Sequence, residues 1–120
     1  MAELTIRCMS FGFKHGAPAD ADILLDVRFL DNPFYVPNLK EKNGLCSDVQ
    51  AFVLKDDHAQ EFLQRLYAML DYTLPLYAYK GRQRLTIAFA CTGGRHRSVT
   101  VAETVAAHLR EQGGPVTVWH

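Results

Sequence analysis

The sequence has few of the features that mark a secreted, membrane-bound or generally nucleic-acid-binding protein. No apolar run reaches the roughly 18 residues needed to cross a bilayer. The start of the chain lacks the basic and apolar segments of a secretory signal, so we expect a cytoplasmic protein with no membrane partner. Lys plus Arg number 13, as do Asp plus Glu, which makes the formal net charge zero. Proteins that bind nucleic acid indiscriminately are basic overall, so the charge balance argues against that class.

Cysteines are too few and too scattered to build a disulfide scaffold. The chain has three of them, Cys8, Cys46 and Cys91, so any intramolecular scheme leaves one unpaired. That placement suits a reducing compartment. Internal repeats, low-complexity tracts and Pro/Gly/Ser linkers are also absent. The histidines and aspartates show no metal-ligand spacing, so we expect neither a metal nor a cofactor.

Strand-like and helix-like patterns alternate along the chain. Apolar periodicity predicts strands over residues 4–13, 23–30, 84–90 and 115–119, and helices over 48–54, 58–79 and 98–112. Ser47 is the expected cap of the first helix, and Pro75 is expected to kink or divide the second. The apolar run 23–30 is typical of a strand covered on both faces. We predict one α/β domain over residues 1–120, a sandwich with a small, mostly parallel sheet flanked by helices.

Cations are concentrated in a window that contains no acid. Asp and Glu are absent between Asp71 and Glu103. The window holds Lys80, Arg82, Arg84, Arg95 and Arg97. It also holds a glycine pair between a predicted strand and a predicted helix. This coincidence favours an anion site over a chance cluster of charges on solvated faces.

The turn after the predicted strand 84–90 is the main candidate site. Ligands of parallel sheets bind beyond the carboxyl ends of strands, where loops lead into helix N-termini. Glycines leave the backbone amides accessible, the helix end adds its dipole, and arginine can bind two phosphate oxygens at once. The predicted anion-binding residues are Cys91, Thr92, Gly93, Gly94, Arg95, His96, Arg97 and Ser98.

Three further basic residues are candidate second contributors: two follow the first predicted strand, and one lies near the end of the second. They are Lys14, His15 and Arg28. In a parallel sheet the ends of both strands open onto the same crevice as the turn. For Arg28, an ion pair with Asp26 is the alternative.

The turn matches neither a Walker A loop nor a dinucleotide-binding GxGxxG fingerprint. It resembles the Cys-x5-Arg-Ser/Thr loop of cysteine-dependent phosphatases, which would make Cys91 a nucleophile and Arg97 the phosphate clamp. Those phosphatases usually have His where this chain has Ala90, and Asp31 is the one candidate for a general acid. A phosphatase is therefore the alternative to the main interpretation, which is a binding module and not an enzyme.

A second resemblance covers most of the chain. The stretches SFGFKHGAPADADILLDVRFLDNPFYVP (10–37) and LTIAFACTGGRHRSV (85–99) are similar to the C-terminal domain of the RapZ family of bacterial RNase adapter proteins. The resemblance implies an α/β domain related to phosphosugar-binding lobes, which senses glucosamine-6-phosphate, binds small regulatory RNAs and helps to assemble a tetramer. For this chain it implies a regulatory module that binds a phosphorylated small molecule such as an amino-sugar phosphate. It also implies small-RNA binding and a homo-oligomer. The RNA contacts that we expect are Lys80, Arg82, Arg84 and Arg95.

The chain departs from the family pattern in three respects. It shows neither the Walker A loop of the family's N-terminal domain nor the family's basic C-terminal tail. We therefore expect a stand-alone domain that does not bind ATP or GTP. Phe34 stands where the family often carries His near the sugar-phosphate site, which implies an altered choice of ligand.

Overall fold

The computed structural model describes residues 4–120 and contains one four-stranded sheet. In chain order the elements are β1 (Thr5–Gly12), η1 (Phe13–His15), β2 (Ile23–Asp26), η2 (Pro33–Tyr35), α1 (Ser47–Val53), α2 (Asp57–Tyr79), β3 (Arg84–Cys91), α3 (Arg97–Glu111) and β4 (Val116–Trp119). The strand order is β2–β3–β1–β4, and each of the three pairings is parallel. The predicted α/β class and parallel sheet are confirmed.

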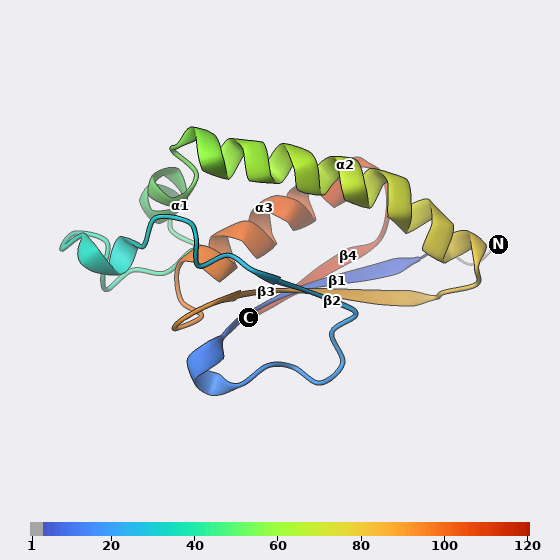
Figure 1. Cartoon of the computed structure of the whole chain (residues 1–120), viewed down its shortest axis with the longest axis horizontal. Coiled ribbons are helices and arrows are strands. Elements are labelled where there is room, and N and C mark those ends of the chain that lie inside the picture. Colours follow the sequence, from blue (N-terminus) through green and yellow to red (C-terminus); the bar gives the residue numbers. More distant parts are fainter. Residues whose placement is uncertain (1–3) are drawn as a thin grey trace.

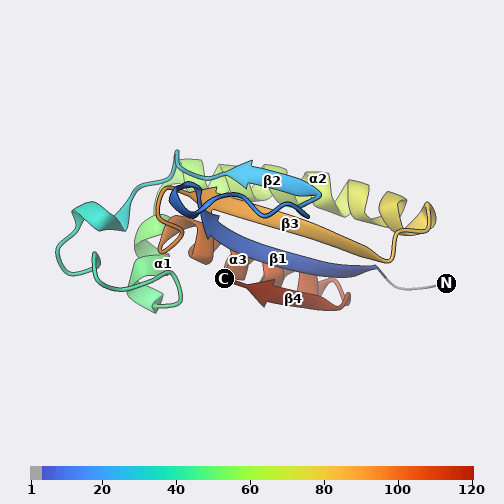
Figure 2. The same cartoon turned by 90° about the horizontal axis from the view of Figure 1, so that it is seen from below.

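The three α-helices lie on one face of the sheet (Figure 1). Seen from below, the sheet is in front, with α2 behind β2 and β3 and with α3 behind β1 and β4 (Figure 2). The opposite face carries none of the described α-helices, and the segment between β1 and β2 runs across part of it. The expectation that residues 23–30 form a strand covered on both faces is therefore wrong. Leu24 on this open face is 42% exposed.

The second strand is short because only the first half of the apolar run 23–30 pairs in the sheet. β2 ends at Asp26, and the chain then turns, so that Val27 and Leu30 enter the core beyond the sheet. Both side chains are buried, together with Cys8, Ile87 and Phe89 of the central strands. An apolar run that predicts one strand is thus divided here between a strand and a buried turn.

Two sequence expectations about the helices are wrong, namely a Ser47 cap on the first helix and a division of the second helix at Pro75. Ser47 is the first residue of α1 and does not cap it, since Cys46 occupies the N-cap without a side-chain bond. Pro75 lies inside α2, which continues undivided to Tyr79. Pro75 faces solvent, where the carbonyl that loses its amide partner can be hydrated. Asp56 caps α2 by accepting a hydrogen bond from the Ala59 amide at 2.8 Å.

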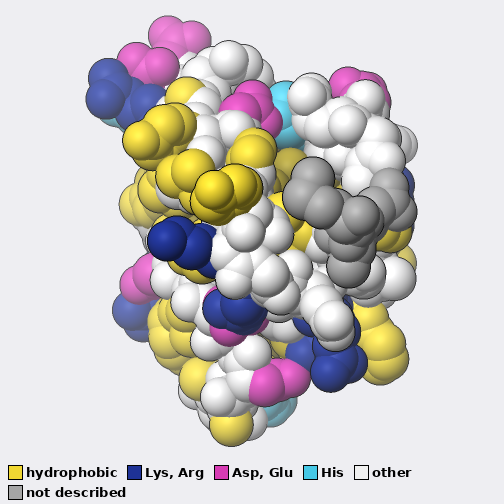
Figure 3. Space-filling view, turned by 90° about the vertical axis from the view of Figure 1, so that its right-hand side faces the viewer, with side chains coloured by type: hydrophobic (Ala, Val, Ile, Leu, Met, Phe, Trp, Pro, Cys, Tyr) yellow, Lys and Arg dark blue, Asp and Glu magenta, His cyan; other side chains and the backbone are white. Residues whose placement is uncertain are grey.

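α2 buries one leucine stripe and exposes another apolar stripe. Leu63, Leu66, Leu70 and Leu74 face the core, as the helical spacing predicts. The exposed stripe is Met69, Tyr72, Leu76 and Tyr79. Figure 3 faces the end of the molecule where α2 finishes and shows hydrophobic side chains gathered on its upper part. None of the described helices is long and apolar enough to span a membrane.

Candidate anion-binding site

The carboxyl ends of the three adjacent strands meet at one edge of the sheet. Cys91 at the end of β3 pairs with Gly12 at the end of β1, and Ala90 pairs with Asp26 at the end of β2. The segments that follow these strands surround a cavity of about 570 Å³. This volume lies in the range of small-molecule sites, about 300 to 1,000 Å³. The cavity therefore lies at the edge of the sheet where the parallel topology predicts a ligand site.

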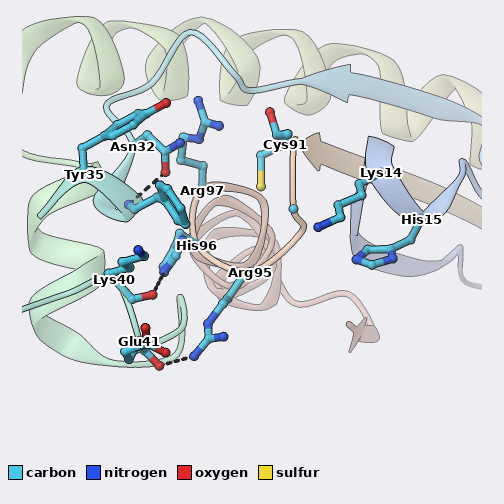
Figure 4. Close-up of a pocket in the computed structure, with 13 residues that line it drawn as sticks. Lys14, His15, Asn32, Tyr35, Lys40, Glu41, Cys91, Arg95, His96 and Arg97 are labelled. Atoms are coloured by element: carbon cyan, nitrogen blue, oxygen red, sulfur yellow. Dashed lines mark hydrogen bonds between the residues drawn. The ribbon is translucent and has the colours of Figure 1, made fainter. Parts of the chain in front are cut away.

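Basic side chains dominate the lining of this cavity (Figure 4). They are Lys14, His15, Lys40, Arg95, His96 and Arg97. Glu41 is the one acidic residue among the described lining residues. The remainder of the lining is Asn32, Phe34, Tyr35, Cys91, Thr92 and Gly93. Such a lining attracts anions and repels cations.

The glycines hold the turn against the end of β1. Gly94 has a φ of +73°, and a Cβ built on it would lie 2.5 Å from the Gly12 amide nitrogen. A Cβ built on Gly12 would lie 2.5 Å from the Gly93 carbonyl carbon. The Lys14 amide also donates to the Thr92 carbonyl at 3.1 Å. Backbone packing this close requires glycine at both contact positions.

The Cys91 thiol lies beneath the turn, at the start of α3. Its Sγ is 3.2 Å from the Ser98 hydroxyl oxygen and accepts a hydrogen bond from the Ser98 amide at 3.4 Å. Burial would raise the pKa of Cys91. The Ser98 hydroxyl and amide, the Gly94 amide and the positive charge of Arg97 outweigh burial, so the pKa lies below its ordinary value of 9.0. The pocket beneath the turn thus stabilises negative charge.

Arg97 is a buried cation whose hydrogen bonds go to neutral carbonyls. Its side chain is held by the Arg28 carbonyl at 2.6 Å and the Leu30 carbonyl at 3.2 Å, both accepting from Nη1. Its Nε has no partner among the described residues, and the residue is only 6% exposed. Buried arginines are usually paired with a carboxylate. Among residues 4–120, Arg97 has no such salt bridge.

Arg95 and His96 hold the segment 40–42 against the turn. His96 Nε2 donates to the Lys40 carbonyl at 3.1 Å, and Arg95 donates to the carbonyls of Glu41 and Lys42. Figure 4 shows the contacts of His96 with Lys40 and of Arg95 with Glu41. The three consecutive basic residues of the turn therefore anchor two backbone stretches, at residues 28–30 and 40–42.

The structure brings some of the predicted site residues together and separates others. Lys14 and His15 line the cavity with Cys91, Thr92, Gly93 and Arg95–Arg97. Gly94 and Ser98 lie behind this surface. Arg28 does not line the cavity, because its guanidinium binds both carboxylate oxygens of Asp26 and lies over the Phe13 ring. The hydrogen bonds from Arg28 in turn lower the pKa of Asp26.

The predicted RNA contacts do not share one surface. Arg84 starts β3 and Arg95 follows its end, and eight residues of strand rise about 26 Å. Arg82 donates to Asp22 at 2.7 Å, and Lys80 precedes it at the end of α2. The acid-free window of the sequence is thus divided into two regions by β3.

A second cavity, of about 460 Å³, lies near the start of β3. Its lining includes Arg84, Trp119 and Asp22, together with Arg7 and Asp20, which form an ion pair. Trp119 is 57% exposed, and the Arg7 guanidinium lies 5.6 Å from the centre of its ring. Figure 3, which faces this end, shows Lys and Arg side chains scattered among other types.

Sequence reasoning missed four lining residues, all in the segment between β2 and α1. They are Asn32, Tyr35, Lys40 and Glu41. The length of this segment and its two prolines were the signal that could have found them, since long loops tend to carry function. Asn32 also shapes the segment, because its side chain accepts from the Phe34 amide at 3.1 Å.

Two further chemistries find little support in the side chains present. Among residues 4–120, no three His, Cys, Asp or Glu side chains converge on a possible metal position. Asp31, the candidate general acid of the phosphatase alternative, is ion-paired with Lys55 and does not line the cavity. Lys55 correspondingly lowers the pKa of Asp31, which favours its charged form and disfavours proton donation.

Comparison with known proteins gives consistent results along the chain. A family model described as the RapZ C-terminal domain matches residues 4–120. The chain is 51% identical over 110 residues to a nucleotide-binding protein of Desulforapulum autotrophicum, covering 92% of this chain and 38% of the relative. It is 50% identical to nucleotide-binding proteins of Limosilactobacillus fermentum over 115 residues and Caldicellulosiruptor bescii over 117 residues. These alignments cover 96% and 98% of this chain and 40% of each relative, so the chain spans about two fifths of their length.

Proposed function

Because this chain belongs to the RapZ C-terminal domain family, we propose that it binds a phosphorylated small molecule in the cavity at the turn between β3 and α3, as a regulatory module. The phosphate accepts hydrogen bonds from the amides of Thr92 and Gly93, which line the cavity. Arg97 and Lys14 neutralise its charge. The dipole of α3 adds to their attraction.

The observation that carries this proposal is the charge of Arg97. The Arg97 guanidinium is almost completely buried and bonded only to neutral carbonyls, so no carboxylate of the described residues pairs with it. An anion in the adjoining cavity would compensate that charge. The excess of basic over acidic lining residues supports the same ligand class.

The remaining walls of the cavity favour a ligand larger than phosphate itself. The family resemblance points to an amino-sugar phosphate, and the cavity has a volume of about 570 Å³ for the sugar. Glu41 is a suitable partner for an ammonium group, and Phe34 offers an apolar face to a sugar ring. Since Phe34 replaces a common family histidine, this chain's preference among sugars should differ from the family's.

Isothermal titration calorimetry tests the proposal directly. Glucosamine 6-phosphate, glucose 6-phosphate, a nucleoside monophosphate, unphosphorylated glucosamine and inorganic phosphate are titrated into the protein. We expect at least one sugar phosphate to bind about tenfold tighter than inorganic phosphate or more, since a few added hydrogen bonds supply this difference. If none binds better than inorganic phosphate, the proposed ligand class is wrong.

Lys14→Met is the matched variant for the same titration. The Lys14 side chain lines the cavity and makes no hydrogen bond with any described residue, so its removal leaves the fold intact. We expect the affinity for the sugar phosphate to fall by about tenfold, as for loss of one charge-assisted contact. Lys80→Met, at the opposite end of the molecule, controls for net charge and should bind as the wild type does.

Small-RNA binding is a second candidate function, favoured by the second cavity. An exposed tryptophan beside arginines is a common arrangement for stacking single-stranded bases and holding phosphates. We expect Arg7→Glu and Arg84→Glu to weaken RNA binding across sequences and to reduce its salt dependence. Fluorescence anisotropy with a labelled RNA at several salt concentrations measures both effects. No affinity at low salt in the wild type would remove this function.

A further inference from the structure

The three cysteines occupy different chemical environments. Cys8 is fully buried in β1, where burial raises the pKa of its thiol to about 12. Cys46 is half-buried at the N-cap of α1. Cys91 is only 3% exposed, but it lines the cavity. It is therefore the one of these thiols that a small molecule reaches by entering the proposed site.

The surroundings of Cys91 stabilise its sulfur as an anion. The Ser98 amide donates to Sγ at 3.4 Å, and the thiol donates to the Ser98 hydroxyl oxygen at 3.2 Å. Once the thiol is ionised, the same hydroxyl can donate to the sulfur. The buried cation Arg97 lines the same cavity, and its Nε has no partner among the described residues. Thiolates are the reactive form of cysteine, and an electropositive setting promotes them. The cluster combines a nucleophile, its hydrogen-bond donors and a cation at a solvent-accessible cavity.

We propose that Cys91 is a site of covalent modification by small electrophiles and hydroperoxides, and that an anion bound in the cavity protects it. The protection rests on the proposed function, because it requires an anion at the turn. The modification itself does not. A modified sulfur is larger and lies beneath the phosphate position, so modification and anion binding exclude each other.

Both classes of reagent react with the Cys91 thiolate by displacement of a leaving group. With hydrogen peroxide, the thiolate sulfur attacks one oxygen, an S–O bond forms and the O–O bond breaks. Hydroxide leaves, and Cys91 becomes a sulfenic acid. With iodoacetamide, an S–C bond forms, the C–I bond breaks and iodide leaves. In both cases the thiol proton passes to solvent before the attack.

The test is a labelling time course on the wild-type protein, followed by peptide mapping with mass spectrometry. Iodoacetamide is added at about pH 7, and modification of each cysteine is followed separately. We expect Cys91 to react about tenfold faster than Cys46 or more, as expected for a larger thiolate fraction. Cys8 should stay unmodified until the protein is unfolded. Hydrogen peroxide with dimedone, which traps sulfenic acid, should label the same residue.

The same time course is repeated with a large excess of inorganic phosphate and with the best-binding sugar phosphate. Protection of Cys91 but not of Cys46 supports the proposal. If Cys46 reacts first and Cys91 only on unfolding, the modification site is wrong, even where calorimetry shows a bound sugar phosphate. If Cys91 reacts rapidly but no anion slows it, the protection is wrong and the proposed function loses support, whereas the modification site stands.

Variants on α3 separate a reactive site from a merely accessible one. Ser98→Ala removes the hydroxyl that contacts Sγ, so the pH midpoint of Cys91 labelling should rise towards 9.0. Thr104→Ala removes a hydroxyl elsewhere on α3, where it bonds the Thr100 carbonyl, and serves as the control. An identical midpoint in the wild type and Ser98→Ala would overturn the assigned role of Ser98. A midpoint at or above 9.0 for Cys91 labelling in the wild-type protein would overturn the proposal itself.

Discussion

The glycine pair of the turn provides the sharpest structural prediction. Gly94 and Gly93 are adjacent, but only Gly94 has a positive φ and only its Cβ would meet other backbone atoms. An alanine at position 94 costs about 1 to 2 kcal/mol for the left-handed conformation. The contact at 2.5 Å with the Gly12 nitrogen must also be relieved by moving β1 or the turn, at a further cost of about 1 to 3 kcal/mol for overpacking. We therefore expect Gly94→Ala to lose about 2 to 5 kcal/mol of unfolding free energy.

Gly93→Ala is the matched control, since a methyl group on Gly93 would have no described atom within 4 Å outside its chain neighbours. We expect its unfolding free energy to change by less than about 1 kcal/mol. Thermal unfolding followed by circular dichroism measures both variants, and Tm of Gly94→Ala should fall by about 8 °C or more. Equal Tm values for the two variants would refute the backbone-contact argument. Gly93 lines the cavity, so Gly93→Ala should weaken phosphate binding while the fold is unchanged.

Three further predictions concern stability and local opening. Because burial raises the pKa of Cys8 from 9.0 to about 12, the stability that the protonated thiol contributes is fully present below pH 9. Between pH 9 and about 12 the free energy of unfolding should fall by about 1.4 kcal/mol per pH unit. Urea unfolding at about pH 8 and pH 10 measures this decrease, and Cys8→Ala should abolish it. Arg95→Gln breaks the bonds to two carbonyls of segment 40–42, so hydrogen exchange of that segment should accelerate about tenfold, whereas Arg65→Gln on the exposed face of α2 should leave it unchanged. Pro75→Ala supplies the missing amide donor inside α2 and should raise Tm by a few degrees; a lower Tm would show that Pro75 packing matters more.

The sequence predicted the sheet, the helices and the turn because each depends on local pattern. The apolar run of β3 and the glycines after it predict a buried strand that ends in a loop, and both are present. The resemblance to the RapZ family is confirmed by the match over residues 4–120. The position of Lys14 and His15 at the cavity followed from parallel topology alone, since adjacent parallel strands end at the same edge.

Non-local partners were not predictable from the sequence. The contacts of Arg95 and His96 with carbonyls 40–42 involve residues more than 50 positions apart, and a carbonyl has no side-chain signature. For the same reason, the cations of the acid-free window do not form one surface. A count of charges along the chain does not show that the two halves of the acid-free window lie at opposite ends of β3. Nor does it show that Asp22 forms an ion pair with Arg82.

The basic residues of the turn hold the fold and are also the candidate ligands for an anion. A carbonyl is a neutral acceptor, whereas a phosphate oxygen carries negative charge and a phosphate can accept two hydrogen bonds from one guanidinium. An arriving phosphate therefore competes with the carbonyls of residues 28, 30 and 40–42 for the same cations. Arg97 has enough N–H groups to serve both, because only Nη1 is used by carbonyls. An alanine at position 97 would remove an anchor and a ligand together, so loss of binding could not be separated from loss of structure. The Lys14 side chain lines the cavity without an anchoring bond to any described residue, which is why its substitution, and not that of the arginines, decides whether the site binds a phosphate.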